Sequence, residues 1–278
     1  MEIGLALPRL DRWQRVADVA RRAEALGVAS LWLADPHPAG GGRAAQAYDG
    51  IEPLTALAGL AEVTSGPRLG VLLRTGMRPP AVVAKALSTA DILSGGRVIL
   101  GLSEGPDAEA GEADRLGEAM QVVKGAFEGG PFTFEGRHHR VNALRCRPRP
   151  LQSPGPQVWI SGSGGPLLAT VARHGDGWGP SGSTGTIADY RRLAAALDQA
   201  CEKAGRDPGG VTRFVSRELP VGTPAEVAEQ VVAWEECGVA TLILDGGALA
   251  LPVANGDQLE DQLQYQLEMV ASAVSSAN

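Results

Sequence analysis

The chain has 278 residues, with 25 basic and 32 acidic side chains and a formal net charge of −7. Hydrophobic residues make up 44% of the chain and aromatic residues only 4%, so its core must be built mainly from aliphatic side chains. This composition excludes disorder as the dominant state, and an acidic chain without a dense basic run is unsuited to nucleic acid or to an anionic membrane. We expect one globular domain over residues 1–278.

The three cysteines, Cys146, Cys201 and Cys237, are widely spaced, so they indicate neither a metal clip nor a disulfide framework. The chain begins without a basic stretch before an apolar run, and no apolar run approaches the ~18–20 residues needed to span a bilayer. We therefore expect a soluble, cytoplasmic protein with reduced thiols and no metal site.

Short apolar or β-branched runs alternate along the chain with longer amphipathic segments. This pattern predicts parallel strands joined by crossover helices. Eight such units in about 250 residues is the count of an α/β protein of the (β/α)8 TIM-barrel class, in which chemistry sits at the carboxyl ends of the strands. The predicted strands are Glu2–Leu7, Ser30–Ala34, Arg68–Arg74, Arg97–Ser103, Gln157–Ser161, Asp176–Pro180, Val211–Glu218 and Thr241–Asp245.

Helix signals lie between these strands. Apolar residues recur at three- and four-residue steps over Trp13–Leu26, and Gly27 follows at a C-cap position. Thr223 stands at the N-cap of a predicted helix over Pro224–Cys237, which Gly238 ends.

The segment Pro131–Pro156 interrupts the alternation. It contains two short strand-like stretches separated by a turn, and we predict a hairpin inserted between the fourth helix and the fifth strand. His138 and His139 fall on this hairpin, where we expect solvated side chains, and their spacing fits no usual zinc motif.

A glycine-rich turn, Ser161–Pro166, follows the fifth strand and leads directly into a helical stripe. Free N–H groups at a helix start attract a phosphate, and the helix dipole adds to this attraction. A plain tight turn would use the same glycines, so the sequence alone favours neither interpretation.

Three polar side chains lie at predicted strand ends. Asp35 and His37 follow the second strand in the stretch Asp35-Pro36-His37-Pro38. The two prolines fix the backbone there, so a carboxylate and an imidazole would be presented rigidly to the barrel mouth. Glu104 follows the fourth strand and is a candidate acid or substrate anchor. The alternatives are a turn-capping Asp35, a solvated His37 and a surface Glu104.

Three motifs together resemble the luciferase-like family of flavin- and deazaflavin-dependent oxidoreductases, over nearly the whole chain. The first runs from Leu69 through Pro80–Ala84 to Asp91–Gly101, with the sequence Asp-Ile-Leu-Ser-Gly-Gly-Arg-Val-Ile-Leu-Gly at its end. The second is Gly162–Gly165 followed by Ala172–Trp178, and the third is Gly222–Val227.

The resemblance implies a barrel that holds the flavin or deazaflavin ring over the strand ends, with its phosphate near the loop after the fifth strand. In the family the third strand carries a bulge, often with a non-prolyl cis peptide, against the ring; Leu72, Leu73 and Arg74 match it. The cofactor-binding residues that the resemblance implies are Asp35, Leu72, Leu73, Arg74, Gly162, Ser163, Gly164, Gly165, Trp178 and Ser181.

The run Pro80–Ala84 and the turn Gly164–Pro166 look more like the branch that uses deazaflavin, which resembles sugar-phosphate dehydrogenases, than like the light-emitting flavin branch. The leading hypothesis is therefore hydride transfer between coenzyme F420 and a small organic substrate, with His37 and then Glu104 as the catalytic candidates for proton transfer. In that branch a histidine and a glutamate stand where this chain has Pro36 and Pro106.

Three alternatives stay open. The first is a monooxygenase that uses FMN and dioxygen. The second is a non-catalytic barrel that binds the cofactor, motivated by Pro36 and Pro106. The third, a phosphosugar isomerase or lyase, is disfavoured because the only lysines fall in predicted helices. Family members are often homodimers, and the apolar helices after the second and third strands offer such an interface.

Overall fold

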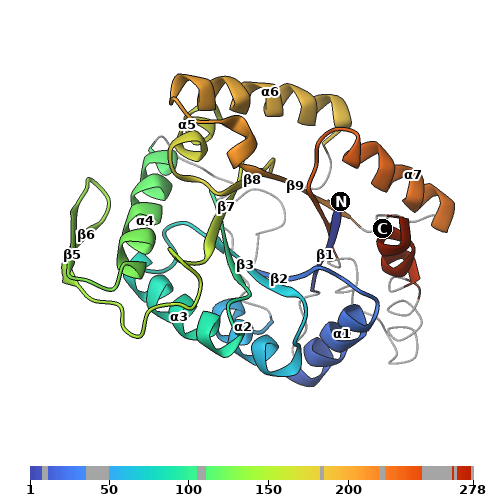
Figure 1. Cartoon of the computed structure of the whole chain (residues 1–278), viewed down its shortest axis with the longest axis horizontal. Helices are drawn as coiled ribbons and strands as arrows, with labels where there is room; N and C mark the ends of the chain where they lie inside the picture. The colour runs from blue at the N-terminus through green and yellow to red at the C-terminus, as the bar shows by residue number, and fades with distance from the viewer. Residues whose placement is uncertain are drawn as a thin grey trace.

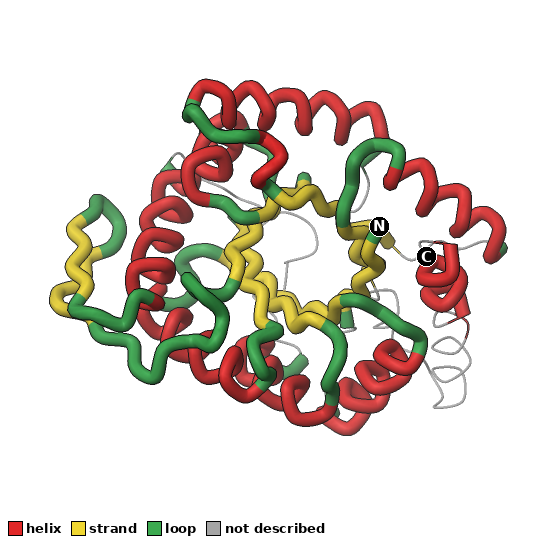
Figure 2. The backbone as a smooth tube through the Cα atoms, viewed as in Figure 1, coloured by secondary structure: helices red, strands yellow, loops and turns green. Residues whose placement is uncertain are grey.

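The computed structural model describes residues 1–7, 12–35, 50–104, 111–181, 185–218, 223–245, 265 and 268–276. Eight parallel strands close into a barrel in which neighbours along the chain are neighbours in the sheet (Figure 2). All eight predicted strands are confirmed, with ends that differ by at most one residue. They are β1 (Glu2–Ala6), β2 (Ser30–Ala34), β3 (Arg68–Arg74), β4 (Val98–Ser103), β7 (Gln157–Ser161), β8 (Gly177–Gly179), β9 (Thr212–Glu218) and β10 (Thr241–Asp245).

Helices surround the barrel (Figure 1). Gly27 and Gly238 follow α1 and α7 with φ of +83° and +80°, the left-handed conformation that a helix-ending glycine adopts. The predicted N-cap at Thr223 is confirmed and forms a capping box with Glu226, although α7 ends two residues before Cys237. Within the described ranges, no helix has the length and apolar character needed to cross a membrane. The helices are α1 (Trp13–Ala25), α2 (Pro53–Val63), α3 (Pro80–Leu93), α4 (Glu112–Phe127), α5 (Gly165–His174), α6 (Ile187–Lys203) and α7 (Pro224–Glu235), with helical residues also at 268–276.

The predicted hairpin is confirmed as the antiparallel pair β5 (Phe132–Glu135) and β6 (Arg140–Leu144), which lies outside α4 (Figure 1). Phe132 packs so closely on α4 that a Cβ at Gly125 would lie 2.2 Å from its ring. Glu118 of α4 accepts hydrogen bonds from three consecutive backbone N–H groups at the hairpin turn, at 2.7, 2.7 and 2.8 Å. The hairpin is thereby held against α4 both at its first strand and at its turn.

A layer of large aromatic side chains fills the barrel interior. The ring centroids of Trp32 and Trp159 are 5.3 Å apart, and those of Trp159 and Phe214 are 5.1 Å apart. Neighbouring inward positions are glycines, because a Cβ at Gly70 would lie 2.2 Å from the Trp32 ring and one at Gly177 would lie 2.6 Å from the Trp159 ring. Large and small residues therefore alternate around the layer, as a small barrel requires.

Above the aromatic layer, the strand register places small residues on the inner face of β4, β7 and β8 at their carboxyl ends. Pairing of Leu72 with Gly101 and of Ser103 with Ser161 continues the inward-facing rows of β3, β4 and β7. Gly179 pairs with Ser161 in the same row. The aromatic layer thus fills the barrel at mid-height, and the glycines and serines lie toward the carboxyl ends of the strands, where chemistry sits in this fold.

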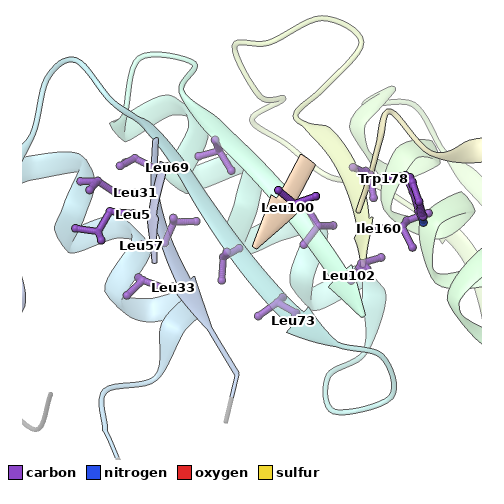
Figure 3. Close-up of a cluster of buried hydrophobic side chains, with 14 of the residues drawn as sticks. Leu5, Leu31, Leu33, Leu57, Leu69, Leu73, Leu100, Leu102, Ile160 and Trp178 are labelled. Atoms are coloured by element: carbon purple, nitrogen blue, oxygen red, sulfur yellow. The ribbon is translucent and has the colours of Figure 1, made fainter. Parts of the chain in front are cut away.

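The outward-facing side chains of the same strands pack against the helices. Leu73, Leu102 and Ile160 belong to this second, larger cluster, together with the fully buried Trp178 (Figure 3). Side chains alternate between the two faces of a strand, so the side chains in this outer cluster point away from the barrel interior and cannot contact a ligand at the mouth.

Replacing Gly70 with alanine should lower the free energy of unfolding by about 1–3 kcal/mol, because the added methyl overlaps the Trp32 ring in a closely packed core. Chemical denaturation measures this change. Gly130→Ala is the matched control, since no atom lies within 4 Å of the Cβ it would add. Equal effects of the two substitutions would contradict the packing argument.

Candidate functional site

Asp35 sits at the end of β2 and is 1% exposed. Its carboxylate accepts two hydrogen bonds from the Arg78 guanidinium, both at 2.8 Å, and a third from the Arg74 N–H at 2.9 Å. Arg78 also pairs with Glu52, whose side chain caps the start of α2. A bidentate pair of this kind is geometrically specific, so Asp35 joins the ends of β2 and β3 to α2. Its contact with a cofactor stays a prediction.

Arg74 and Ser103 are paired in the register of β3 and β4, and both face the barrel mouth. Ser103 is 3% exposed. The Arg74 Nε and the Ser103 Oγ are buried and have no hydrogen-bond partner among the described residues. Buried polar atoms are nearly always paired in folded proteins, so two neighbouring exceptions at a barrel mouth indicate a place where a ligand supplies the partners.

The bulge that the family resemblance implies on the third strand is absent. Leu72, Leu73 and Arg74 pair in unbroken register with Gly101, Leu102 and Ser103, which leaves no extra residue for a bulge. The cis peptide bonds among the described residues are Arg147–Pro148 and Ser153–Pro154, so none falls on this strand.

The regular strand divides the three residues between two faces. Leu72 and Arg74 face the mouth, while Leu73 is buried in the outer cluster (Figure 3). Only the backbone of Leu73 is therefore available to a ligand at the mouth.

The turn after β7 leads into α5 without a capping side chain. A Cβ at Gly165 would have no atom within 4 Å, and one at Gly164 would meet only Pro166 Cδ, at 4.0 Å. Neither glycine has a positive φ, so neither is required by the turn's own conformation. The exposed N–H groups and the open space in front of them fit an anion seat at a helix start.

The ends of β7 and β8 are held together by a hydrogen bond of 3.0 Å from the Gly162 N–H to the Gly179 carbonyl. Trp178 is fully buried in the outer cluster, and its indole N–H donates to the Gly162 carbonyl at 2.9 Å. Trp178 thus supports the glycine turn from behind. Ser163 and Ser181 lie partly exposed and exposed at the ends of β7 and β8, and their cofactor contacts stay predictions.

Glu104 directly follows β4 and is half-buried beside the glycine turn, with Oε2 3.8 Å from the position of a Cβ at Gly162. Burial raises the pKa of its carboxyl, and the negative charge of Glu112 raises it further. A carboxyl whose pKa is raised at a barrel mouth can hold a proton for transfer. The other acid-base candidate, His37, lies outside the described residues.

Several mouth residues were not singled out as site residues from the sequence. Ser103 and Arg78 gain their significance from partners on other strands, and only knowledge of the strand register would have identified them. His138 and His139 were expected to be solvated, but this is wrong at their Nε2 atoms, which are buried because the hairpin turn folds onto α4.

The closed barrel, with unpaired buried polar atoms at the carboxyl ends of its strands, defines a (β/α)8 protein of the kind that carries active sites at this end. Residues 2–219 match the model of the family described as luciferase-like monooxygenase. The chain therefore belongs to the luciferase-like family.

Two curated relatives show the range of this family. The chain is 33% identical to pyrimidine monooxygenase RutA of Klebsiella pneumoniae subsp. pneumoniae over 182 residues, 59% of the chain and 49% of that protein. It thus spans about half the length of this relative. It is 30% identical to the F420-dependent glucose-6-phosphate dehydrogenase of Kineococcus radiotolerans over 237 residues, 79% of the chain and 68% of that protein.

A solved structure shares this fold. An F420-dependent secondary alcohol dehydrogenase, in complex with an F420-acetone adduct, superposes with a TM-score of 0.81 at 14% identity, covering 100% of this chain and 99% of the other.

Because its pKa is raised on folding, Glu104 holds its proton to higher pH in the folded protein than in the unfolded chain. Raising the pH through this interval therefore costs stability. Glu104→Gln should stabilise the protein at neutral pH relative to the wild type, and the difference should shrink toward about pH 4. Denaturant titrations across this range measure it.

Glu118→Gln is the opposing control. Burial opposes ionisation of Glu118, but hydrogen bonds from the His138, His139 and Arg137 N–H groups lower its pKa overall. Its contribution to stability is present at neutral pH and is lost as the pH falls through the lowered pKa. The same pH trend for both variants would refute the assignment of a raised pKa to Glu104.

Proposed function

We propose that this protein is an oxidoreductase that transfers a hydride between the deazaflavin coenzyme F420 and a small organic substrate. The unpaired Arg74 Nε and Ser103 Oγ carry the proposal, because they offer hydrogen-bonding atoms for the polar edge of a flat ring at the mouth. The open start of α5 offers a seat for the phosphate of the same ligand. It follows β7, which is the second strand from β3 in the barrel, with β4 between them.

The coenzyme, when bound, supplies the two-electron chemistry. The chain's part is to bind and orient the ligand over the small side chains of the mouth, above the Trp32 and Trp159 layer that keeps water out of the barrel. Glu104 would hold the proton on its carboxyl beside the glycine turn, and His37 is the second proposed proton carrier.

The match to the F420-dependent dehydrogenase extends over more of both chains than the match to the pyrimidine monooxygenase, which favours F420. The higher identity to the monooxygenase favours a second candidate, an FMN-dependent monooxygenase that uses dioxygen. The two candidates share the same mouth and differ in the ring it accepts.

Tryptophan fluorescence during separate titrations with F420 and FMN distinguishes them, because Trp32 lies directly below the mouth. We expect saturable quenching by F420. Arg74→Gln should weaken F420 binding about tenfold or more, since a hydrogen bond to a charged group is lost. Arg191→Gln, an exposed change on α6, is the control and should leave the affinity unchanged.

Preference for FMN would favour the monooxygenase, and tight F420 binding without turnover over a substrate screen would favour a non-catalytic barrel. Failure of both ligands to bind would refute the proposal.

A second substitution tests the phosphate seat independently of folding. Gly165→Ala places a methyl group in open space, so the free energy of unfolding should be unchanged or rise by about 0.4–1 kcal/mol. F420 affinity should nevertheless fall about tenfold, because the methyl group occupies space in front of the helix start. Unchanged affinity in a stably folded variant would leave a plain tight turn as the role of these glycines.

A further inference from the structure

The hairpin turn presents two imidazoles to the rim of the barrel. The Glu118 carboxylate binds the N–H groups of Arg137, His138 and His139, so this turn is fixed to α4 by three charge-assisted hydrogen bonds. Glu118 is thereby occupied by backbone groups, and the two imidazoles keep their Nε2 atoms for other partners.

Three side-chain nitrogens of this region are buried without a hydrogen-bond partner among the described residues. They are the Nε of Arg115 and the Nε2 atoms of His138 and His139. The Arg115 Nε forms an ion pair with the Glu112 Oε2 at 3.6 Å, a separation too long for a hydrogen bond. Three neighbouring unpaired nitrogens exceed what isolated packing defects explain.

The three side chains lie together around two glycines. Arg115 Cδ and Nη1 are 3.8 Å from the position of a Cβ at Gly76, and His138 Cε1 and Nε2 are 3.9 Å from one at Gly111. His139 lines a cavity of about 20 Å³ together with Gly76. That volume holds about one water-sized group, and apolar side chains that include Val83 and Leu102 form much of its wall.

The region holds charges of both signs. Burial lowers the pKa of His139, Glu118 and a backbone hydrogen bond with Arg115 oppose this shift, and the positive charges of Arg115 and His138 reinforce it. Two further arginines, Arg74 and Arg78, line the same cavity. Of these, Arg78 is neutralised by Asp35 and Glu52.

Arg115, His138 and His139, called the cluster below, lie close to the barrel mouth. Gly76 lies in the loop after β3, and Gly111 is the N-cap of α4, which follows β4. These are the same two strands whose ends carry Arg74 and Ser103. The cluster is therefore on the rim next to the proposed ring site, on the opposite side of β4 from the β7 and β8 ends that form the phosphate seat.

We propose that Arg115, His138 and His139 form an anion-binding subsite that recognises a carboxylate or phosphate group on the substrate. An anion would supply acceptors for the three nitrogens that have no hydrogen-bond partner among the described residues. As a substrate subsite the proposal rests on the proposed oxidoreductase function, whereas binding of a free anion by the cluster does not.

The imidazole carbon-bound proton signals of the uncomplexed protein provide the test, because the chain has only four histidines. Sodium acetate and sodium phosphate are titrated separately, with sodium chloride holding the ionic strength constant. The His138 and His139 signals should shift saturably, and the pKa of His139 should rise when the anion binds. Arg115→Gln and His139→Gln should each weaken binding about tenfold.

His174 is the internal control, since it also lies among cations, Arg173, Lys124 and Arg206, but on α5. Arg191→Gln on α6 is the control variant. Shifts that follow His174, or that persist unchanged in Arg115→Gln, would overturn the subsite.

A repeat at saturating F420 identifies the source of the anion. If acetate or phosphate still shifts the histidine signals when the coenzyme is bound, the cluster binds a group of the substrate. If the bound coenzyme abolishes these shifts, the substrate assignment is overturned, and the cluster binds the phosphate of the coenzyme. If fluorescence shows no coenzyme binding, the oxidoreductase proposal fails separately, and the uncomplexed titration still decides whether the cluster binds anions.

Discussion

The packing of three large aromatic rings against glycines inside the barrel is the constraint on which the site depends. Trp32, Trp159 and Phe214 fill the interior at one level only because Gly70 and Gly177 leave room for the rings. This layer closes the barrel to water and sets the floor of the mouth. The inner face above it is lined by glycines and serines on β4, β7 and β8, small residues that leave room for a ligand.

The polar groups at the mouth divide into those that build it and those that stay available. The Asp35 carboxylate accepts hydrogen bonds from the Arg78 guanidinium and from the Arg74 N–H, so it holds the strand ends in place. That contact uses the backbone of Arg74 and leaves the Nε of its side chain unpaired beside Ser103. Stability and binding are thus assigned to different atoms of neighbouring residues, which is how a rigid site keeps unsatisfied groups without collapsing onto them.

The barrel was predictable because its determinants are local. Apolar runs, a capping box at Thr223 and glycines at helix ends each specify an element within a few residues, and the strand ends agree to one residue. The face on which a side chain lies depends instead on non-local register. Leu73 and Trp178 matched family positions, yet both point into the outer cluster. The environment of His138 depends on Glu118, 20 residues away, and no local pattern signals that contact.

The same reasoning explains why the inserted hairpin matters for specificity. Barrel strands must keep their inner row small to admit a ring, so they have few positions left from which to select a substrate. An insertion anchored to α4 adds polar side chains at the rim without altering the strand register. The Nε2 atoms of His138 and His139 have no hydrogen-bond partner among the described residues, so they would be available to select a substrate group on one side of the mouth.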